Sequence, residues 1–267
     1  MQSPPRPVPA RVDIPHRRPR SALQVLIVLT SVDKYPDGSP TGWYLPEAVH
    51  PHAAFVKAGI EVEFASITGT STCDPGSIDA SKDDAVSMAF WADEKLKALT
   101  VSAKKLSDCD VASYDALFFA GGFGVMWDFP GNADVIAAIK TTYALGKPVA
   151  AVCHGPICFT GVEVHESLIS IIAYRVLYGE RFPVAPPRTV SRERAECSNS
   201  GPSPITHTNP CHLFQIDGVY IIKDKEVTGF TNAEENAVGK YEAVSTPSGP
   251  GSCEDVMTAA GGAFPPT

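Results

Sequence analysis

Short apolar runs alternate with helix-forming segments from residue 23 onward, and this alternation constrains the fold more than any other feature. Four runs have the length and composition of buried β-strands, at residues 24–30, 60–66, 116–120 and 148–152. The segments between them predict helices at residues 46–58, 85–99 and 133–145. Because alternation at this pitch is typical of right-handed βαβ units, the sequence predicts an α/β fold, a three-layer sandwich around a mostly parallel sheet.

The last of these strands ends on a cysteine. In the run 148–156 (PVAAVCHGP), Cys153 directly follows the apolar residues, and Pro156 stands where a first helical turn begins. This is the layout of a nucleophile elbow, whose strained bend costs about 1–3 kcal/mol. A helix starting there favours the thiolate. The alternative is a small buried cysteine that caps a core strand, but the residues His154-Gly155-Pro156 favour the nucleophile.

A glycine-rich turn, Gly121-Gly122-Phe123-Gly124, follows the strand at 116–120. Ligands of parallel sheets bind beyond the carboxyl ends of the strands, so this turn and Cys153 are expected at one edge. The backbone N–H of Gly122 or Phe123, with that of His154, is the candidate oxyanion hole, and Gly121 belongs to the same substrate-binding turn. The turn lacks the rest of a phosphate-binding or dinucleotide fingerprint, so no nucleotide cofactor is expected.

Charge and composition exclude several functions. The net charge of −8 over 267 residues leaves no basic surplus for general nucleic-acid binding. No apolar run approaches 18 residues, so no membrane span is expected. The seven cysteines have no regular spacing and no signal peptide opens the chain, which predicts reduced thiols and a cytoplasmic protein. Residues 1–22 are rich in arginine and proline and predict a disordered extension; a mitochondrial presequence is disfavoured by the prolines and Asp13.

Four segments, in order, resemble the ThiJ/PfpI superfamily, and most closely its glyoxalase III-like branch, which includes stress-induced chaperones. They are TSVDKYPDGSPTGWYLPEAVHP (30–51), FFAGGFGVMWDFP (118–130), AVCHGP (151–156) and VTGFTNAEENAVGK (227–240). The resemblance implies a class I glutamine amidotransferase-like, flavodoxin-like domain over residues 23–267. It also implies a stress-response role, a small dicarbonyl substrate and no cofactor, and it is compatible with a homodimer and with a nuclear as well as a cytoplasmic location.

The resemblance also implies roles for four residues. Cys153 matches the nucleophile, His154 the histidine beside it, and Glu47 the acid that contacts the sulfur. Glu235 matches a third, carboxylate member, with Glu234 left as the alternative. The ring of His154 is not expected to reach the sulfur easily from the adjacent position, so Glu235 would have to orient it. A protonated Glu47 would stabilise the thiolate by a charge-assisted hydrogen bond; taken alone, Glu47 is an ordinary first-turn acid.

The implied activity is that of a glutathione-independent glyoxalase, a lyase of the D-lactate dehydratase type that converts methylglyoxal to D-lactate. The alternatives are a cysteine hydrolase of the amidase or peptidase type, a holding chaperone or redox sensor, and an inactive form. A metal site made of Glu47, His50 and His52 is disfavoured, because these candidate ligands lie on part of one helix face and no ligand from a distant segment is identified.

Three features depart from the branch. Phe123 stands where the branch usually has histidine, which removes a polar group from the pocket mouth. Residues 161–214 predict an irregular insert, which we interpret as a translated intron or a gene-model error. The chain is also expected to lack the usual C-terminal strand and helix after residues 263–267.

Overall fold

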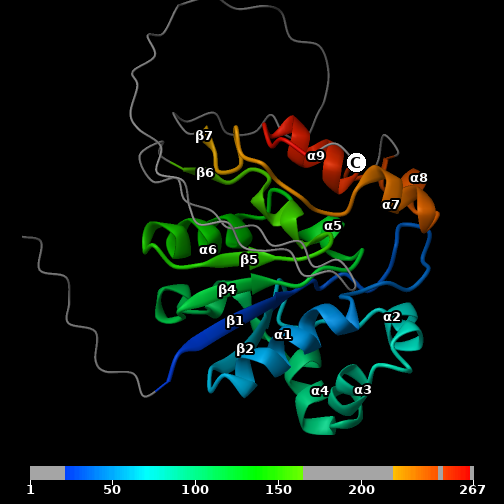
Figure 1. The fold of residues 1–267 in the computed structure, drawn as a ribbon, viewed down its shortest axis with the longest axis vertical. Helices are drawn as coiled ribbons and strands as arrows, with labels where there is room; N and C mark the ends of the chain where they lie inside the picture. The colour runs from blue at the N-terminus through cyan, green and yellow to red at the C-terminus, as the bar shows by residue number, and fades with distance from the viewer. Residues whose placement is uncertain (1–21, 165–218, 246–248, 265–267) are drawn as a thin grey trace, which may run out of the picture.

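The centre of the fold is a five-stranded parallel sheet with the order β3-β2-β1-β4-β5 (Figure 1). The computed structural model describes residues 22–164, 219–245 and 249–264. The strands are β1 (Gln24–Leu29), β2 (Glu61–Ser66), β3 (Lys104–Lys105), β4 (Ala116–Phe119) and β5 (Val149–Ala151). The four expected strands are confirmed. β3 was missed because it consists of two exposed lysines and has no apolar signal.

Six α-helices connect these strands. They are α1 (Leu45–Lys57), α2 (Pro75–Ala80), α3 (Ala85–Ala92), α4 (Glu94–Val101), α5 (Val125–Asp128) and α6 (Ala133–Ala144). The 3₁₀ turns η1 (Leu106–Asp108) and η2 (Val111–Ser113) precede β4. The single helix expected at 85–99 is wrong, because Asp93 adopts an extended conformation and its side chain caps α4 through the N–H groups of Lys95 and Leu96.

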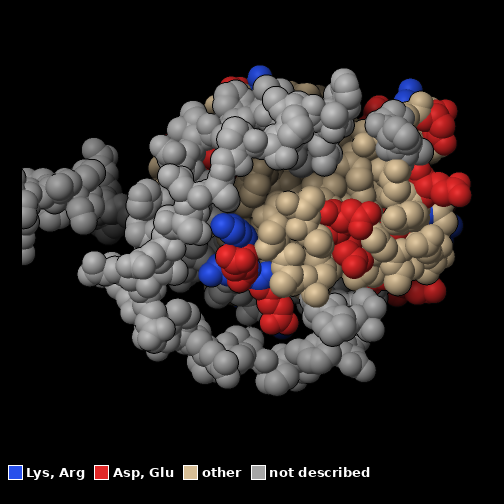
Figure 2. Space-filling model, turned by 90° about the horizontal axis from the view of Figure 1, so that it is seen from above, with Lys and Arg blue, Asp and Glu red and all other residues tan. Residues whose placement is uncertain are grey.

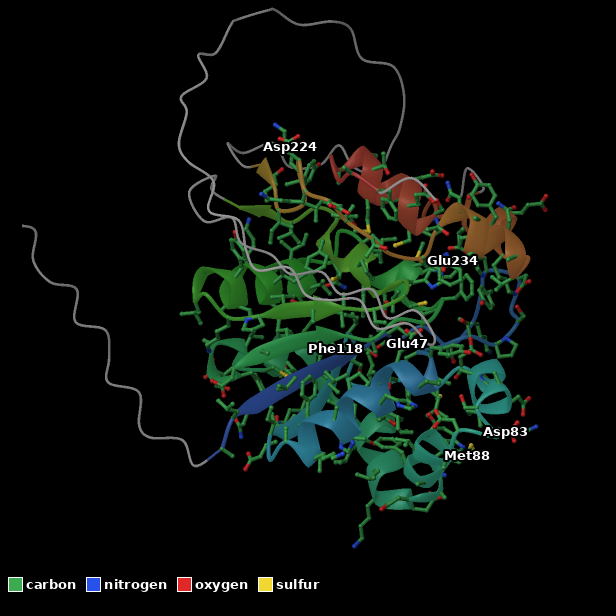
Figure 3. All side chains as sticks on the ribbon, in the orientation of Figure 1. Glu47, Asp83, Met88, Phe118, Asp224 and Glu234 are labelled. Carbon is green, nitrogen blue, oxygen red and sulfur yellow. The ribbon has the colours of Figure 1, made fainter. Side chains whose placement is uncertain are left out.

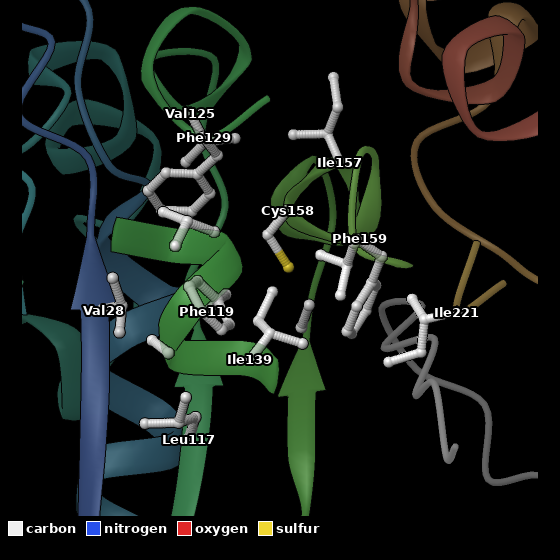
Figure 4. Packing of buried hydrophobic residues seen from close by; sticks show 14 of the residues in the cluster. Val28, Leu117, Phe119, Val125, Phe129, Ile139, Ile157, Cys158, Phe159 and Ile221 are labelled. Carbon is white, nitrogen blue, oxygen red and sulfur yellow. The ribbon is translucent and has the colours of Figure 1, made fainter. Parts of the chain in front are cut away.

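The two faces of the sheet pack against different helices, which confirms the three-layer arrangement. Val25, Ile27 and Leu29 of β1 lie in a buried cluster with side chains of α1 and α3. Leu26 and Val28 point the other way, into a cluster that includes Phe119 of β4 and residues of α6. Figure 4 shows this second cluster, where Cys158 and Ile139 fill the space beside Phe119. Each such buried side chain contributes about 1.5–3 kcal/mol.

After β5 the chain forms the 3₁₀ helix η3 (Gly155–Phe159) and β6 (Glu163–Val164), which pairs antiparallel with β7 (Val219–Tyr220). The helices α7 (Asn232–Ala237), α8 (Tyr241–Ser245) and α9 (Cys253–Ala259) follow and lie together beyond β5 (Figure 1). Residues 161–164 are therefore ordered as a turn and a short strand. The rest of the expected insert up to residue 214 and the expected extension over residues 1–21 lie outside the described residues.

The described surface carries more acidic than basic side chains on the face seen in Figure 2, where groups of Asp and Glu are separated by wide uncharged areas. Among the described residues, no helix has both the length and the apolar character needed to span a bilayer.

Candidate active site

A strained backbone turn places Cys153 at the carboxyl edge of the sheet. Cys153 has φ of 57°, a left-handed conformation that non-glycine residues rarely adopt. The N–H of Gly155 donates to the carbonyl oxygen of Val152 at 2.7 Å and closes the turn. At Gly155 a Cβ would lie 2.7 Å from the carbonyl oxygen of Phe119, so the turn requires glycine there. Strain of this kind is typical of functional sites.

The turn Gly121-Gly122 follows β4 and meets the elbow from the neighbouring strand. A Cβ at Gly121 would lie 2.5 Å from Glu47 Oε2 and 2.9 Å from the Cβ of Cys153, and Gly122 has φ of 101°. Both positions therefore need glycine for the two turns to approach. The backbone N–H groups of Gly122 and His154 hydrogen-bond to the Cys153 sulfur. The structure therefore brings two of the amides expected at an oxyanion hole, those of Gly122 and His154, to the sulfur.

Glu47 reaches the sulfur from the first turn of α1. Its Oε2 accepts a hydrogen bond from the N–H of Gly121 at 3.0 Å, and its carboxyl group is hydrogen-bonded to Cys153. In Figure 3 Glu47 lies at the start of α1, beside the end of the sheet. Although the residue as a whole is partly buried, the carboxyl group faces inward, and its burial raises the pKa of Glu47 to about 7.

Glu47 and Cys153 form a coupled pair that resists carrying two negative charges. Burial, followed by the charge of Glu47, raises the pKa of the Cys153 thiol well above its ordinary value, while the two backbone N–H groups oppose this rise. The expected helix dipole is also weak here, because η3 is a five-residue 3₁₀ helix. An ionised Glu47 therefore disfavours the thiolate, whereas the raised pKa of Glu47 agrees with the protonated carboxyl group that the sequence predicts beside the sulfur.

His154 lies beside the sulfur. Its Nδ1 lies 3.2 Å from the Cys153 sulfur, and its Nε2 lies 2.9 Å from Oε1 of Glu235. The expectation that the ring would not reach the sulfur is wrong, because the left-handed backbone at Cys153 brings the two adjacent side chains to the same side. With Nε2–H donating to the carboxylate, the lone pair of Nδ1 faces the thiol. His154 and Glu235 are 1% and 0% exposed, so this contact is shielded from water.

The structure also distinguishes Glu235 from Glu234. Glu234 Oε2 accepts from the backbone N–H of Thr231 at 2.8 Å, and Thr231 Oγ1 accepts from the N–H of Glu234, which together form a capping box at the start of α7. Glu234 lies on α7 in Figure 3. The pattern Thr231-x-x-Glu234 is a sequence signal for this cap, and it could have excluded Glu234 from the site.

Two aromatic side chains pack against the ring of His154. The ring centroids of Phe123 and Phe230 lie 4.4 Å and 4.2 Å from that of His154. Sequence reasoning singled out Phe123 for its place in the turn but missed Phe230, since one aromatic residue before a helix cap carries no distinctive pattern.

The alternative metal ligands do not converge. His50 Nε2 lies 2.6 Å from Asp84, and the ring of His52 stacks on Phe64. Throughout the described part of the chain, no group of three His, Cys, Asp or Glu side chains is placed to hold a metal ion.

The fold and the site define a class of protein: a parallel α/β sandwich with a cysteine at a strand-to-turn elbow, flanked by a carboxyl group and a His–Glu pair. The profile of the DJ-1/PfpI family matches residues 42–167. SNO4 of Saccharomyces cerevisiae, a probable glutathione-independent glyoxalase, is 31% identical over 166 residues, which cover 60% of this chain and 69% of the relative. The chain therefore belongs to the DJ-1/PfpI family.

One further curated relative and two solved structures are also similar to this chain. Glyoxalase 3 of Candida albicans is 36% identical over 145 residues, covering 53% of this chain and 61% of the relative. The crystal structure of glyoxalase III from the same organism has a TM-score of 0.64 at 25% identity, and that of Rapid Encystment Protein 24 kDa from Francisella tularensis has 0.66 at 29%. Each match covers 92% of this chain. The match covers 83% of the Candida albicans chain and 84% of the Francisella tularensis chain. The chain spans about 60% of the length of the first curated relatives it matches.

Proposed function

We propose that the protein is a glutathione-independent glyoxalase that converts methylglyoxal to D-lactate, a lyase of the D-lactate dehydratase type. One observation carries the proposal: the Cys153 thiol is held between the carboxyl group of Glu47 and Nδ1 of His154, which Glu235 orients. The names of the curated relatives support the same activity.

The first step is attack on the aldehyde. Nδ1 of His154, 3.2 Å from the sulfur, accepts the thiol proton, and the thiolate bonds to the aldehyde carbon. The aldehyde oxygen gains the electron pair of the C=O bond and takes the proton back from His154, which gives a neutral hemithioacetal and leaves His154 neutral. The N–H groups of Gly122 and His154, which already point at the sulfur, stabilise the charge that develops on that oxygen.

The second step moves a proton between the two carbons of the hemithioacetal. We assign this transfer to Glu47, whose pKa of about 7 suits a group that removes and returns a proton near neutral pH. Removal of the proton from the sulfur-bearing carbon gives an enediol, and protonation of the neighbouring carbon gives a thioester of lactate.

Water then hydrolyses the thioester. As water attacks the thioester carbon and the C–S bond breaks, His154 accepts a proton from the water and passes it to the leaving sulfur, which restores the thiol and releases the acid. The aldehyde carbon is oxidised to the level of an acid while the ketone carbon is reduced to an alcohol. The sequence of steps is therefore balanced without an external oxidant or reductant.

The test is methylglyoxal consumption by the full chain, with the chirality of the lactate determined. Cys153→Ala is expected to lower turnover to below a few per cent of wild type while the thermal transition is retained. Cys158→Ala is the matched control, because Cys158 is buried in the core beside Phe119 and should affect stability alone. Substantial turnover by Cys153→Ala would exclude covalent catalysis. Amide or peptide hydrolysis without lactate would favour a cysteine hydrolase, and prevention of client aggregation by Cys153→Ser without turnover would favour a chaperone.

A further inference from the structure

A groove of about 290 Å³ runs along α6, and none of its lining residues belongs to the site around Cys153. One wall is α6, and the other is the chain through η1 and η2, which packs against α6. We call it the α6 groove. Its lining includes Asp134 of α6 and Asp110, which precedes η2, together with apolar side chains. We propose that the α6 groove binds the arginine-rich N-terminal segment of the same chain, residues 1–21.

The α6 groove presents two carboxyl groups. Asp110 is exposed and Asp134 is partly buried, and no ion pair among the described residues uses either side chain. Within the described part of the chain, the lining contains no Lys or Arg. The Nζ of the nearby Lys147 donates to the carbonyl oxygens of Ala112 and Tyr114, at 2.6 Å in each case. This cation is therefore engaged by backbone oxygens, and the lining itself is acidic.

The N-terminal segment has the complementary charge. Residues 1–21 contain five arginines and one acidic residue, Asp13, in a chain whose net charge is −8. A guanidinium group binds a carboxylate through two parallel N–H donors, and the aliphatic stem of arginine packs on apolar surface. Val111 and Ala137 supply such a surface between the two carboxyl groups' walls. Arginine therefore matches both components of the lining, whereas an acidic peptide would be repelled.

The described chain also begins close to the α6 groove. The N–H of Gln24, in the first position of β1, donates to Oδ2 of Asp115 at 2.9 Å. Asp115 is three residues after Ala112, which lines the groove, and three residues span at most about 11 Å. In Figure 1 the start of β1 and the C-terminal end of α6 lie at the same end of the sheet. The segment is thus attached beside the surface that it is proposed to bind.

The length of the segment fits this attachment. Arg18 and Arg17 precede the first described residue by four and five positions, which is about 13–18 Å of extended chain. Either one can reach Asp110, and Arg11, up to about 36 Å away along the chain, can reach Asp134. A short tether gives the arginines an effective concentration of the order of millimolar at the groove, so contacts that are individually weak suffice for docking.

Trypsin measures the docking because its cleavage sites in the segment are the arginines themselves. Arg11, Arg17 and Arg20 are cleavable, since none of them precedes proline. The rate of cleavage after Arg17 in the full chain, followed by mass spectrometry, is compared with that in a free peptide of residues 1–22 at the same salt concentration. At low salt the full chain should be cut at least about fivefold more slowly, and in about 1 M NaCl the two rates should converge, because salt screens exposed charges.

The double variant Asp110→Asn/Asp134→Asn removes both carboxylates. Its cleavage after Arg17 should be about fivefold faster than in wild type at low salt, which is about 1 kcal/mol and within the range of two exposed ion pairs. Asp83→Asn is the matched control, because it removes an exposed carboxylate in the turn before α3, far from α6 (Figure 3). Its rate should equal that of wild type, and the thermal transition of each variant verifies that the fold is retained.

Three outcomes would overturn the inference. Equal rates in the wild-type chain and the free peptide at low salt would show that the segment is not docked, and this comparison requires no variant to fold. Protection that persists in the double variant would place the segment on another surface. Protection that increases with protein concentration would show that the segment of a second copy occupies the groove instead. These measurements involve no turnover, so the proposed function stands or falls separately.

Discussion

Replacing Glu47 by Gln is expected to stabilise the fold at alkaline pH while slowing the proposed reaction. The pKa of Glu47 rises from 4.5 to about 7 on folding, chiefly because the carboxyl group is buried. The folded state therefore binds the proton more tightly than the unfolded chain, and the stability of the wild type falls as pH increases from about 4.5 through about 7. Glutamine has no proton to lose, so the variant avoids this fall.

The magnitude follows from the shift. At about 1.4 kcal/mol for each pKa unit, ionising Glu47 in the fold costs about 3 kcal/mol at pH 8 and less than about 1 kcal/mol at pH 5. Glutamine can keep both contacts, since its oxygen can accept from Gly121 N–H and its amide can donate toward the sulfur. The free energy of unfolding of Glu47→Gln relative to wild type should thus increase by about 2–3 kcal/mol between pH 5 and pH 8.

Urea denaturation of both proteins at the two pH values measures this difference directly. Glu63→Gln is the matched control. Partial burial opposes the ionisation of Glu63, but hydrogen bonds from Lys104 and Tyr114 hold its pKa below the ordinary value of 4.5, so its contribution to stability is lost only as pH falls below about 5. The stability of that variant relative to wild type should therefore change little between pH 5 and pH 8. A Glu47→Gln difference that is equal at pH 5 and pH 8 would refute the assignment of Glu47 as a buried, proton-holding group.

The remaining predictions concern the His–Glu pair and the glycine turn. Glu235→Gln should lower kcat by roughly tenfold or more and alter the pH–rate profile, because His154 loses its carboxylate partner, whereas Glu234→Gln should cost about 1 kcal/mol of stability as a weakened cap and leave the profile unchanged. Equal profiles for the two variants would show that Glu235 does not act through His154. Gly121→Ala should destabilise by about 3 kcal/mol and abolish turnover, because its Cβ would lie 2.6 Å from the carbonyl oxygen of Val152. Gly146→Ala meets no atom within 4 Å and should cost only the strain of φ at 65°, about 1 kcal/mol; similar losses in both glycine variants by urea denaturation would contradict the close approach.

The sequence by itself determined the features that local interactions set. Alternating apolar runs located four of the five strands of the parallel sheet but neither β6 nor β7, and the apolar run before Cys153, His154 and Gly155 marked the elbow. The paired glycines at 121 and 122 indicated a tight turn, because the conformations that glycine can adopt depend on the residue itself and not on distant contacts. The break at Asp93 is also a local signal, because an N-cap residue stands there inside a helical pattern.

Only the tertiary structure decided which groups meet and what their chemistry is. Glu235 lies 81 residues beyond His154, and Glu47 is 74 residues before Gly121, so packing rather than local pattern joins them. The same holds for Phe230, whose ring covers His154 because its backbone pairs with Cys153. Burial raises the pKa of Glu47, and burial together with the charge of Glu47 raises the pKa of Cys153; both causes exist only once distant segments exclude water from one place. Periodicity reports which way a side chain faces, whereas solvation and proximity are properties of the assembled fold.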